Sequence, residues 1–158
     1  MSKVFAASEI FQFAIRIEEN GEKFYRLMTD KFKDDKIKDT FNFLADEEVK
    51  HRKIFEKFLS KIESYEPVES FPEEYFQYLR SYADERIFTK EDIAYLAGGK
   101  VDNEKQVLQF AIDREIDSIL YYLEAKNLVS DDKKKEIDKI IDEERHHYLK
   151  LLEIKKTL

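Results

Sequence analysis

The chain contains two copies of one sequence pattern, and this internal repeat restricts its fold more than any other feature. In each copy, a Glu with a Tyr seven residues later is followed by a segment that ends in Glu-x-x-His. The corresponding positions of the two copies are Ala14, Glu18, Tyr25, Glu48 and His51, and Ala111, Glu115, Tyr122, Glu144 and His147. The offset is 97 residues in the first segment and 96 in the second. The chain is therefore expected to fold as two similar halves.

Each half reads as a pair of long helices. Apolar residues recur at spacings of three and four, the period of a helix, in four segments. These segments cover about residues 8–31, 36–64, 103–128 and 131–155. The chain has only 3 Gly and 2 Pro, which argues against a fold rich in strands and turns. The short connections within each half make the paired helices antiparallel neighbours.

The segment 65–102 separates the two halves and breaks the long helical pattern. It contains short amphipathic pieces near 73–82 and 90–97, and Thr89 followed by Asp92 resembles a capping box. We interpret it as a crossover that travels the length of the bundle, so that the third long helix runs parallel to the second. The prediction is an all-α, antiparallel four-helix bundle with one long crossover, with 1–158 as a single domain.

Composition excludes several classes of function. The net charge of -7 disfavours binding to nucleic acid. The chain has no Cys, so it has no disulfides, thiolate metal sites or thiol nucleophiles. No apolar run approaches the roughly 20 residues of a membrane span, and no signal peptide is visible. A cytoplasmic protein without membrane partners is expected.

The two Glu-x-x-His motifs, Glu48 with His51 and Glu144 with His147, carry the strongest functional signal. Residues three apart lie on one face of a helix, so a carboxylate and an imidazole can reach the same ion. Two such pairs and two further carboxylates, from Glu18 and Glu115, make up the ligand set of a binuclear site in a helix bundle. The pattern therefore predicts a two-metal centre.

Residues next to these motifs are weaker ligand candidates, or they allow more than one interpretation. Glu47 lies nearer the edge of its apolar stripe than Glu48, and His146 faces outward. Gly21, one turn after Glu18, indicates either a plain small-residue helix contact or room for the site. The alternative to a metal centre is a bundle with hydrogen-bonded polar layers, although four carboxylates buried together without cations would repel one another.

The same residues resemble the rubrerythrin branch of the ferritin-like superfamily. The resemblance rests on Glu18, Glu48-x-x-His51, Glu115 and Glu144-x-x-His147, and on the flanking text Ala-Ile-Arg-Ile-Glu-Glu-Asn-Gly-Glu-Lys-Phe-Tyr. It implies that Glu48 and Glu144 bridge two iron ions. Glu18 with His51 would complete the site of one ion, and Glu115 with His147 that of the other. Tyr25 and Tyr122 resemble tyrosines that bond to these ligands, although ordinary core tyrosines would fit the same pattern.

Two departures from the family pattern stand out. Ser118 occupies the position of an additional Glu, so the redox-linked ligand exchange of the family would lack that carboxylate here. A cysteine-ligated rubredoxin domain is also missing, which implies a separate electron donor such as a rubredoxin.

Three functions are consistent with this predicted metal centre. The first is an oxidoreductase, peroxidase-like, that reduces hydrogen peroxide or dioxygen. The second is an iron-handling protein or ferroxidase without a dedicated organic substrate, although the usual ferritin site lacks the second His. The third is a bundle that holds zinc as a structural ion, and zinc or manganese could also replace the iron. The aromatic-rich crossover makes a homodimer plausible.

Overall fold

A computed structural model describes residues 7–61, 73–87, 89–97 and 103–158. Within these ranges the chain is helical apart from the helix ends and the short connections at 30–34 and 127–130. The helices are α1 (Ala7–Thr29), α2 (Asp35–Lys61), α3 (Glu73–Arg86), α4 (Lys90–Ala97), α5 (Glu104–Lys126) and α6 (Asp131–Thr157). The expected all-α fold is confirmed, and the four long helices begin and end within three residues of their predicted bounds wherever the structure describes them.

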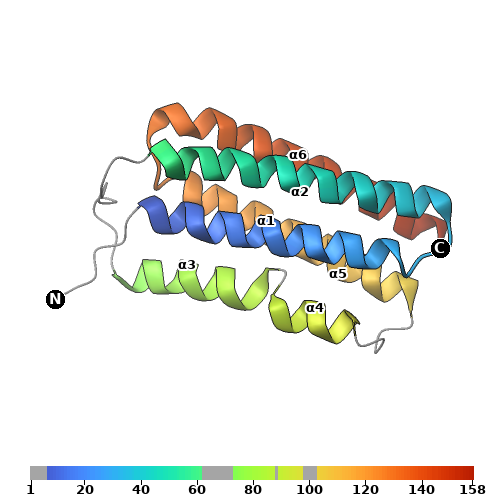
Figure 1. Cartoon of the computed structure of the whole chain (residues 1–158). Helices are drawn as coiled ribbons and strands as arrows, with labels where there is room; N and C mark the ends of the chain where they lie inside the picture. Colours follow the sequence, from blue (N-terminus) through green and yellow to red (C-terminus); the bar gives the residue numbers. More distant parts are fainter. Residues whose placement is uncertain (1–6, 62–72, 88, 98–102) are drawn as a thin grey trace.

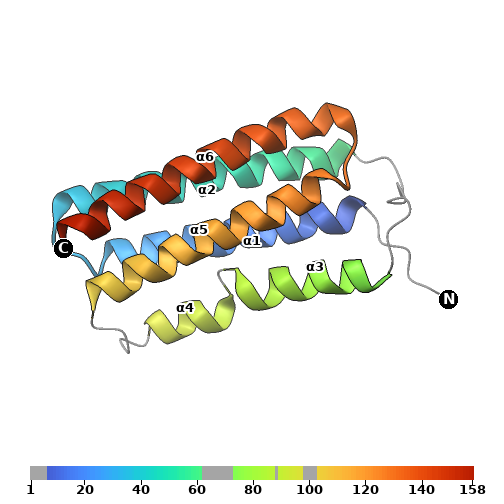
Figure 2. The ribbon, with the colours of Figure 1, turned by 180° about the vertical axis from the view of Figure 1, so that it is seen from behind.

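The four long helices form the bundle, as Figures 1 and 2 show. α1 packs mainly against α2, and α5 against α6, so each half of the repeat is an antiparallel hairpin. α5 runs parallel to α2 and antiparallel to α1, which is the direction that a full-length crossover produces (Figure 1). In the part of the chain that the structure describes, no helix combines the length and apolar character needed to cross a lipid bilayer.

Local signals at the helix ends explain where the elements begin. The Asp34 side chain accepts a hydrogen bond from the backbone N–H of Ile37 (3.1 Å), which caps the start of α2. Asn103 caps α5 in the same way through Lys105 N–H (2.9 Å). Thr89 Oγ1 accepts from Asp92 N–H (3.2 Å) ahead of α4, so this half of the predicted capping box is present. Gly98-Gly99, a dipeptide typical of a turn, lies outside the described residues.

The crossover helices α3 and α4 lie along one side of the bundle, against α1 and α5 (Figures 1 and 2). The inner face of α3 carries its buried residues, Phe76, Leu79 and Ala83. Tyr82 fixes the register, because its hydroxyl donates to the carbonyl of Asp117 on α5 (3.0 Å). Tyr78 points outward and is 55% exposed.

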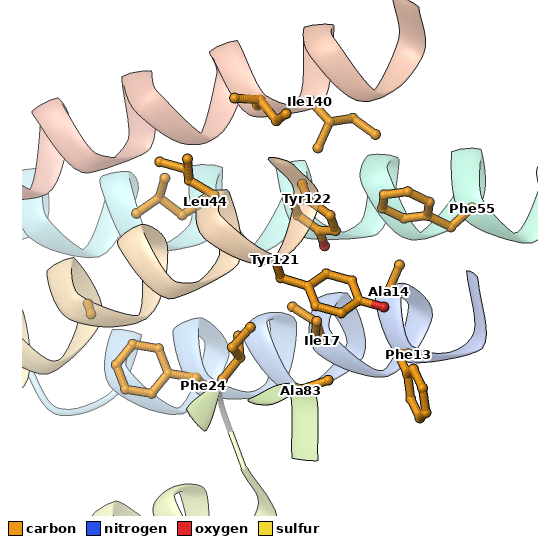
Figure 3. Close-up of a cluster of buried hydrophobic side chains, with 14 of the residues drawn as sticks. Phe13, Ala14, Ile17, Phe24, Leu44, Phe55, Ala83, Tyr121, Tyr122 and Ile140 are labelled. Carbon is orange, nitrogen blue, oxygen red and sulfur yellow. The ribbon is translucent and has the colours of Figure 1, made fainter. Parts of the chain in front are cut away.

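The core between the long helices is aromatic. Figure 3 shows the rings of Tyr121 and Tyr122 from α5 inside the bundle. Tyr122 stacks on Phe55 of α2, with ring centroids 5.3 Å apart. Tyr121 crosses to α1, where its hydroxyl donates to the carbonyl of Ile10 (3.1 Å). This packing fixes α5 against α1 and α2.

Candidate metal centre

Six acidic and histidine side chains meet inside the bundle. Each is no more than 2% exposed: Glu18, Glu48, His51, Glu115, Glu144 and His147. One comes from α1, one from α5, and a Glu/His pair from each of α2 and α6. All six residues that the sequence placed in one site are therefore brought together. Burial of so many ionisable groups is costly unless something compensates their charge.

The donor atoms form two groups that share members. Glu18, Glu48, His51 and Glu144 each offer one atom within 4.8 Å of the others. Glu48, Glu115, Glu144 and His147 do the same. Glu48 and Glu144 belong to both groups, while each group has its own His and its own third carboxylate. Two ions bound side by side, with two bridging carboxylates, require this overlap.

Several of these atoms have no hydrogen-bond partner. They are Glu18 Oε2, Glu115 Oε2, Glu144 Oε1 and His51 Nδ1. His51 Nδ1 lies 2.9 Å from Glu144 Oε1, but the pair lacks the geometry of a hydrogen bond. Buried polar atoms without partners are rare in folded proteins and call for an explanation. Carboxylate oxygens and imidazole nitrogens are ligands for iron, zinc and manganese, so a pair of cations fits these residues.

Two tyrosines bond reciprocally across the two halves of the repeat. The Tyr25 hydroxyl from α1 donates to Glu115 Oε1 on α5. The Tyr122 hydroxyl from α5 donates to Glu18 Oε1 on α1. Each bond orients one carboxylate oxygen and leaves the other, Oε2, without a hydrogen-bond partner. The sequence indicated these tyrosines but not that each one reaches the carboxylate of the opposite helix.

Gly21 provides the space that Glu48 occupies. A Cβ added at Gly21 would lie 2.9 Å from both Cδ and Oε2 of the Glu48 side chain. Real Cβ atoms essentially never approach other atoms so closely. Of the two interpretations of Gly21, room for the site is therefore the one that the geometry supports.

Burial and repulsion between carboxylates shift the protonation of the cluster. Burial, and then repulsion from neighbouring carboxylates, raises the pKa of both Glu48 and Glu115. Burial also acts to raise the pKa of Glu144. Close contacts with Glu115, His147 and His51 outweigh it and hold that pKa well below its usual range. Without cations, the cluster therefore keeps protons on some carboxyl groups and ionises others.

His51 has a carboxylate on each side of its ring. Burial lowers its pKa, but the negative charge of Glu18 and contacts with Glu143 and Glu144 raise it above the ordinary value. Its Nε2 atom lies 2.7 Å from Glu143 Oε2 on α6. Sequence reasoning missed Glu143, although its place beside Glu144 in the repeat was a signal. Ser118 is buried on α5 one turn after Glu115, and its hydroxyl donates to the carbonyl of Arg114 in the same helix (2.9 Å).

A model of the rubrerythrin family matches residues 9–155. The chain belongs to the rubrerythrin family. The match covers both Glu-x-x-His motifs and the crossover. None of the curated proteins matches this member of the family.

Two solved structures are similar to this rubrerythrin-family chain over nearly its whole length. A crystal structure from Thermotoga maritima, of a candidate ferritin-like diiron-carboxylate protein, is 34% identical with a TM-score of 0.68. It covers 99% of this chain and 98% of its own. A hypothetical protein from Pyrococcus furiosus is 22% identical, covers 96% of this chain and 89% of its own, and has a TM-score of 0.67. At 22% identity, the similarity to the Pyrococcus furiosus protein shows a shared fold and nothing further.

Proposed function

We propose that this protein is a di-iron oxidoreductase that reduces hydrogen peroxide to water, and dioxygen more slowly. The observation that carries the proposal is the pair of overlapping ligand groups, each with its own His, around buried donor atoms that lack partners. Membership of the rubrerythrin family and the histidine on both halves favour this reading over a ferritin-type site.

Carboxylate and imidazole ligands suit iron, and iron, unlike zinc, can change oxidation state during this chemistry. Two ferrous ions bound here would supply the two electrons that, with two protons, convert hydrogen peroxide into two molecules of water. Glu48 and Glu144 would bridge the ions, and His51 and His147 would bind one ion each. Glu18 and Glu115 would complete the two sites.

The tyrosines orient the two terminal carboxylates. Burial is the main cause that raises the pKa of Tyr25 and Tyr122, and neighbouring carboxylates raise it further. Both tyrosines therefore stay protonated and keep donating to Glu115 and Glu18. The remaining oxygen of each carboxylate is left as a ligand atom.

The burial of the site limits what can reach it. All six residues are nearly inaccessible. A surface hollow of about 780 Å³ at one end of the bundle is lined instead by residues such as Lys33, Lys36 and Lys150. A substrate as small as peroxide or dioxygen suits a centre enclosed in this way, whereas an organic substrate would need an open pocket.

Stopped-flow mixing of the reduced, iron-loaded protein with each oxidant tests the proposal. We expect oxidation by hydrogen peroxide to be faster than by dioxygen, and continued turnover to require an added electron donor. His51→Ala and His147→Ala should each weaken one metal and slow peroxide consumption, whereas His146→Ala, at an exposed position, should not. Faster reaction with dioxygen, followed by accumulation of a mineral iron core, would instead establish the iron-handling reading.

A further inference from the structure

The two histidines of the centre differ in what lies behind them. His51 directs Nδ1 toward the cluster, 2.9 Å from Glu144 Oε1 and 3.5 Å from Glu18 Oε1. Its other nitrogen, Nε2, faces away from the cluster and meets Glu143 Oε2 at 2.7 Å. A carboxylate thus stands on the side of the ring opposite to the proposed metal.

His147 has no such support. Its Nδ1 also faces the cluster, 3.3 Å from Glu144 Oε2 and 3.8 Å from Glu115 Oε1. Among the described residues, however, no carboxylate accepts a hydrogen bond from its Nε2. The ring of Phe43 stands nearly perpendicular to the His147 ring, at 85°, with centroids 6.2 Å apart.

The internal repeat makes this difference unexpected. Glu47 occupies the position in the first half that Glu143 occupies in the second, 96 residues later. Glu47 forms no hydrogen bond to either histidine in the described structure and instead pairs with Lys50 (3.7 Å). The two halves therefore supply equivalent ligands but differ in the groups around the histidines: in the described structure a carboxylate contacts Nε2 of His51 and none contacts Nε2 of His147.

A carboxylate behind a metal-binding His has known physical consequences. An imidazole that binds a metal through Nδ1 carries its proton on Nε2. An acceptor at Nε2 fixes that tautomer and the ring orientation, and it makes Nδ1 a stronger ligand. Removal of such a partner typically costs about 10–100-fold in metal affinity.

We propose that Glu143 is a positioning residue that makes the two metal subsites unequal. The subsite of Glu18 and His51 then binds its ion more tightly, and fills first, while the subsite of Glu115 and His147 fills second. The inference rests on the proposed binuclear centre and adds an order of loading to it.

Titration of the metal-free protein with Co²⁺, followed by calorimetry and by optical absorption, tests the inference. We expect wild-type protein to bind two ions in two resolved steps. Glu143→Gln should weaken the tighter step by about 10–100-fold, so that the two steps approach each other. Glu47→Gln is the matched control, because it removes an equal charge within 4.8 Å of the same histidine without removing a hydrogen bond.

Nitrogen NMR of the Zn²⁺-loaded protein gives a second readout that a loss of folding stability would not imitate. One of the two metal-bound histidines should show a slowly exchanging, strongly hydrogen-bonded Nε2–H, and Glu143→Ala, which removes the acceptor altogether, should abolish that signal alone.

The outcomes separate this inference from the proposed function. If neither ion binds to wild-type protein, the binuclear centre itself is wrong. If two ions bind with equal affinity, or if Glu143→Gln and Glu47→Gln have equal effects, the centre stands and the role of Glu143 is overturned.

Discussion

At the scale of single residues, Gly21 shows that a site can depend on the absence of a side chain. A Gly inside a helix costs about 1 kcal/mol relative to Ala, so Gly21→Ala would ordinarily stabilise α1. Here the added methyl group would occupy the space of the Glu48 carboxylate. Because Glu48 belongs to both ligand groups, its displacement should weaken both metal sites.

We therefore predict that Gly21→Ala lowers metal affinity while the metal-free protein keeps its free energy of unfolding or gains slightly. Metal titration and urea unfolding of the same samples measure the two effects. Lys23→Ala, at an exposed position on the same helix, is the control that should leave metal affinity unchanged. Wild-type metal affinity in Gly21→Ala would show that Glu48 is not a ligand.

At the scale of elements, α3 is attached to the bundle without supplying any of the six site residues. Its buried face contacts α1 and α5, and Leu79 on that face is 2% exposed. We predict that Leu79→Ala lowers the free energy of unfolding by about 2–5 kcal/mol, through lost burial and the cavity left behind.

Chemical denaturation of the metal-free protein measures this cost. Tyr78→Ala, on the exposed face of the same helix, should change stability by no more than about 0.5 kcal/mol. Without denaturant, where both variants are folded, their affinity for metal should equal that of the wild-type protein. If the Leu79 variant is no less stable than the Tyr78 variant, α3 does not hold the crossover to the bundle in solution.

The elements were also what the sequence predicted best. Helical spacing indicated the four long helices, and the two Glu-x-x-His motifs with Glu18 and Glu115 indicated that these residues belong to one site. Contacts between helices were not predictable in the same way. Whether Tyr25 bonds to Glu115, or Glu143 to His51, depends on the rotation and offset of one helix against another, which a one-dimensional pattern does not contain.

At the scale of the whole molecule, the centre makes stability depend on pH and on metal together. The raised pKa values of Glu48, Glu115 and His51 mean that the metal-free folded state holds protons more tightly than the unfolded chain does. Groups of this kind stabilise the fold at low pH, and that stability is lost as the pH rises through their folded-state values. Glu144 and Glu143, whose pKa values are lowered, act in the opposite direction.

Three groups act against two, and the three are all buried in the cluster, so we predict that the metal-free protein becomes less stable from about pH 6 to about pH 8. The ordinary values of 4.5 for Glu and 6.5 for His place the start of this loss at or below neutrality. Bound cations should replace the protons, so the metal-loaded protein should change little over the same range. Metal binding should release protons and become tighter as the pH rises.

Urea unfolding of both forms across this range, with calorimetry in two buffers of different protonation enthalpy, measures stability and proton release. The double variant Glu48→Gln and Glu115→Gln should flatten the pH dependence of the metal-free protein. A rise in its wild-type stability toward pH 8 would contradict the protonation pattern on which the prediction rests.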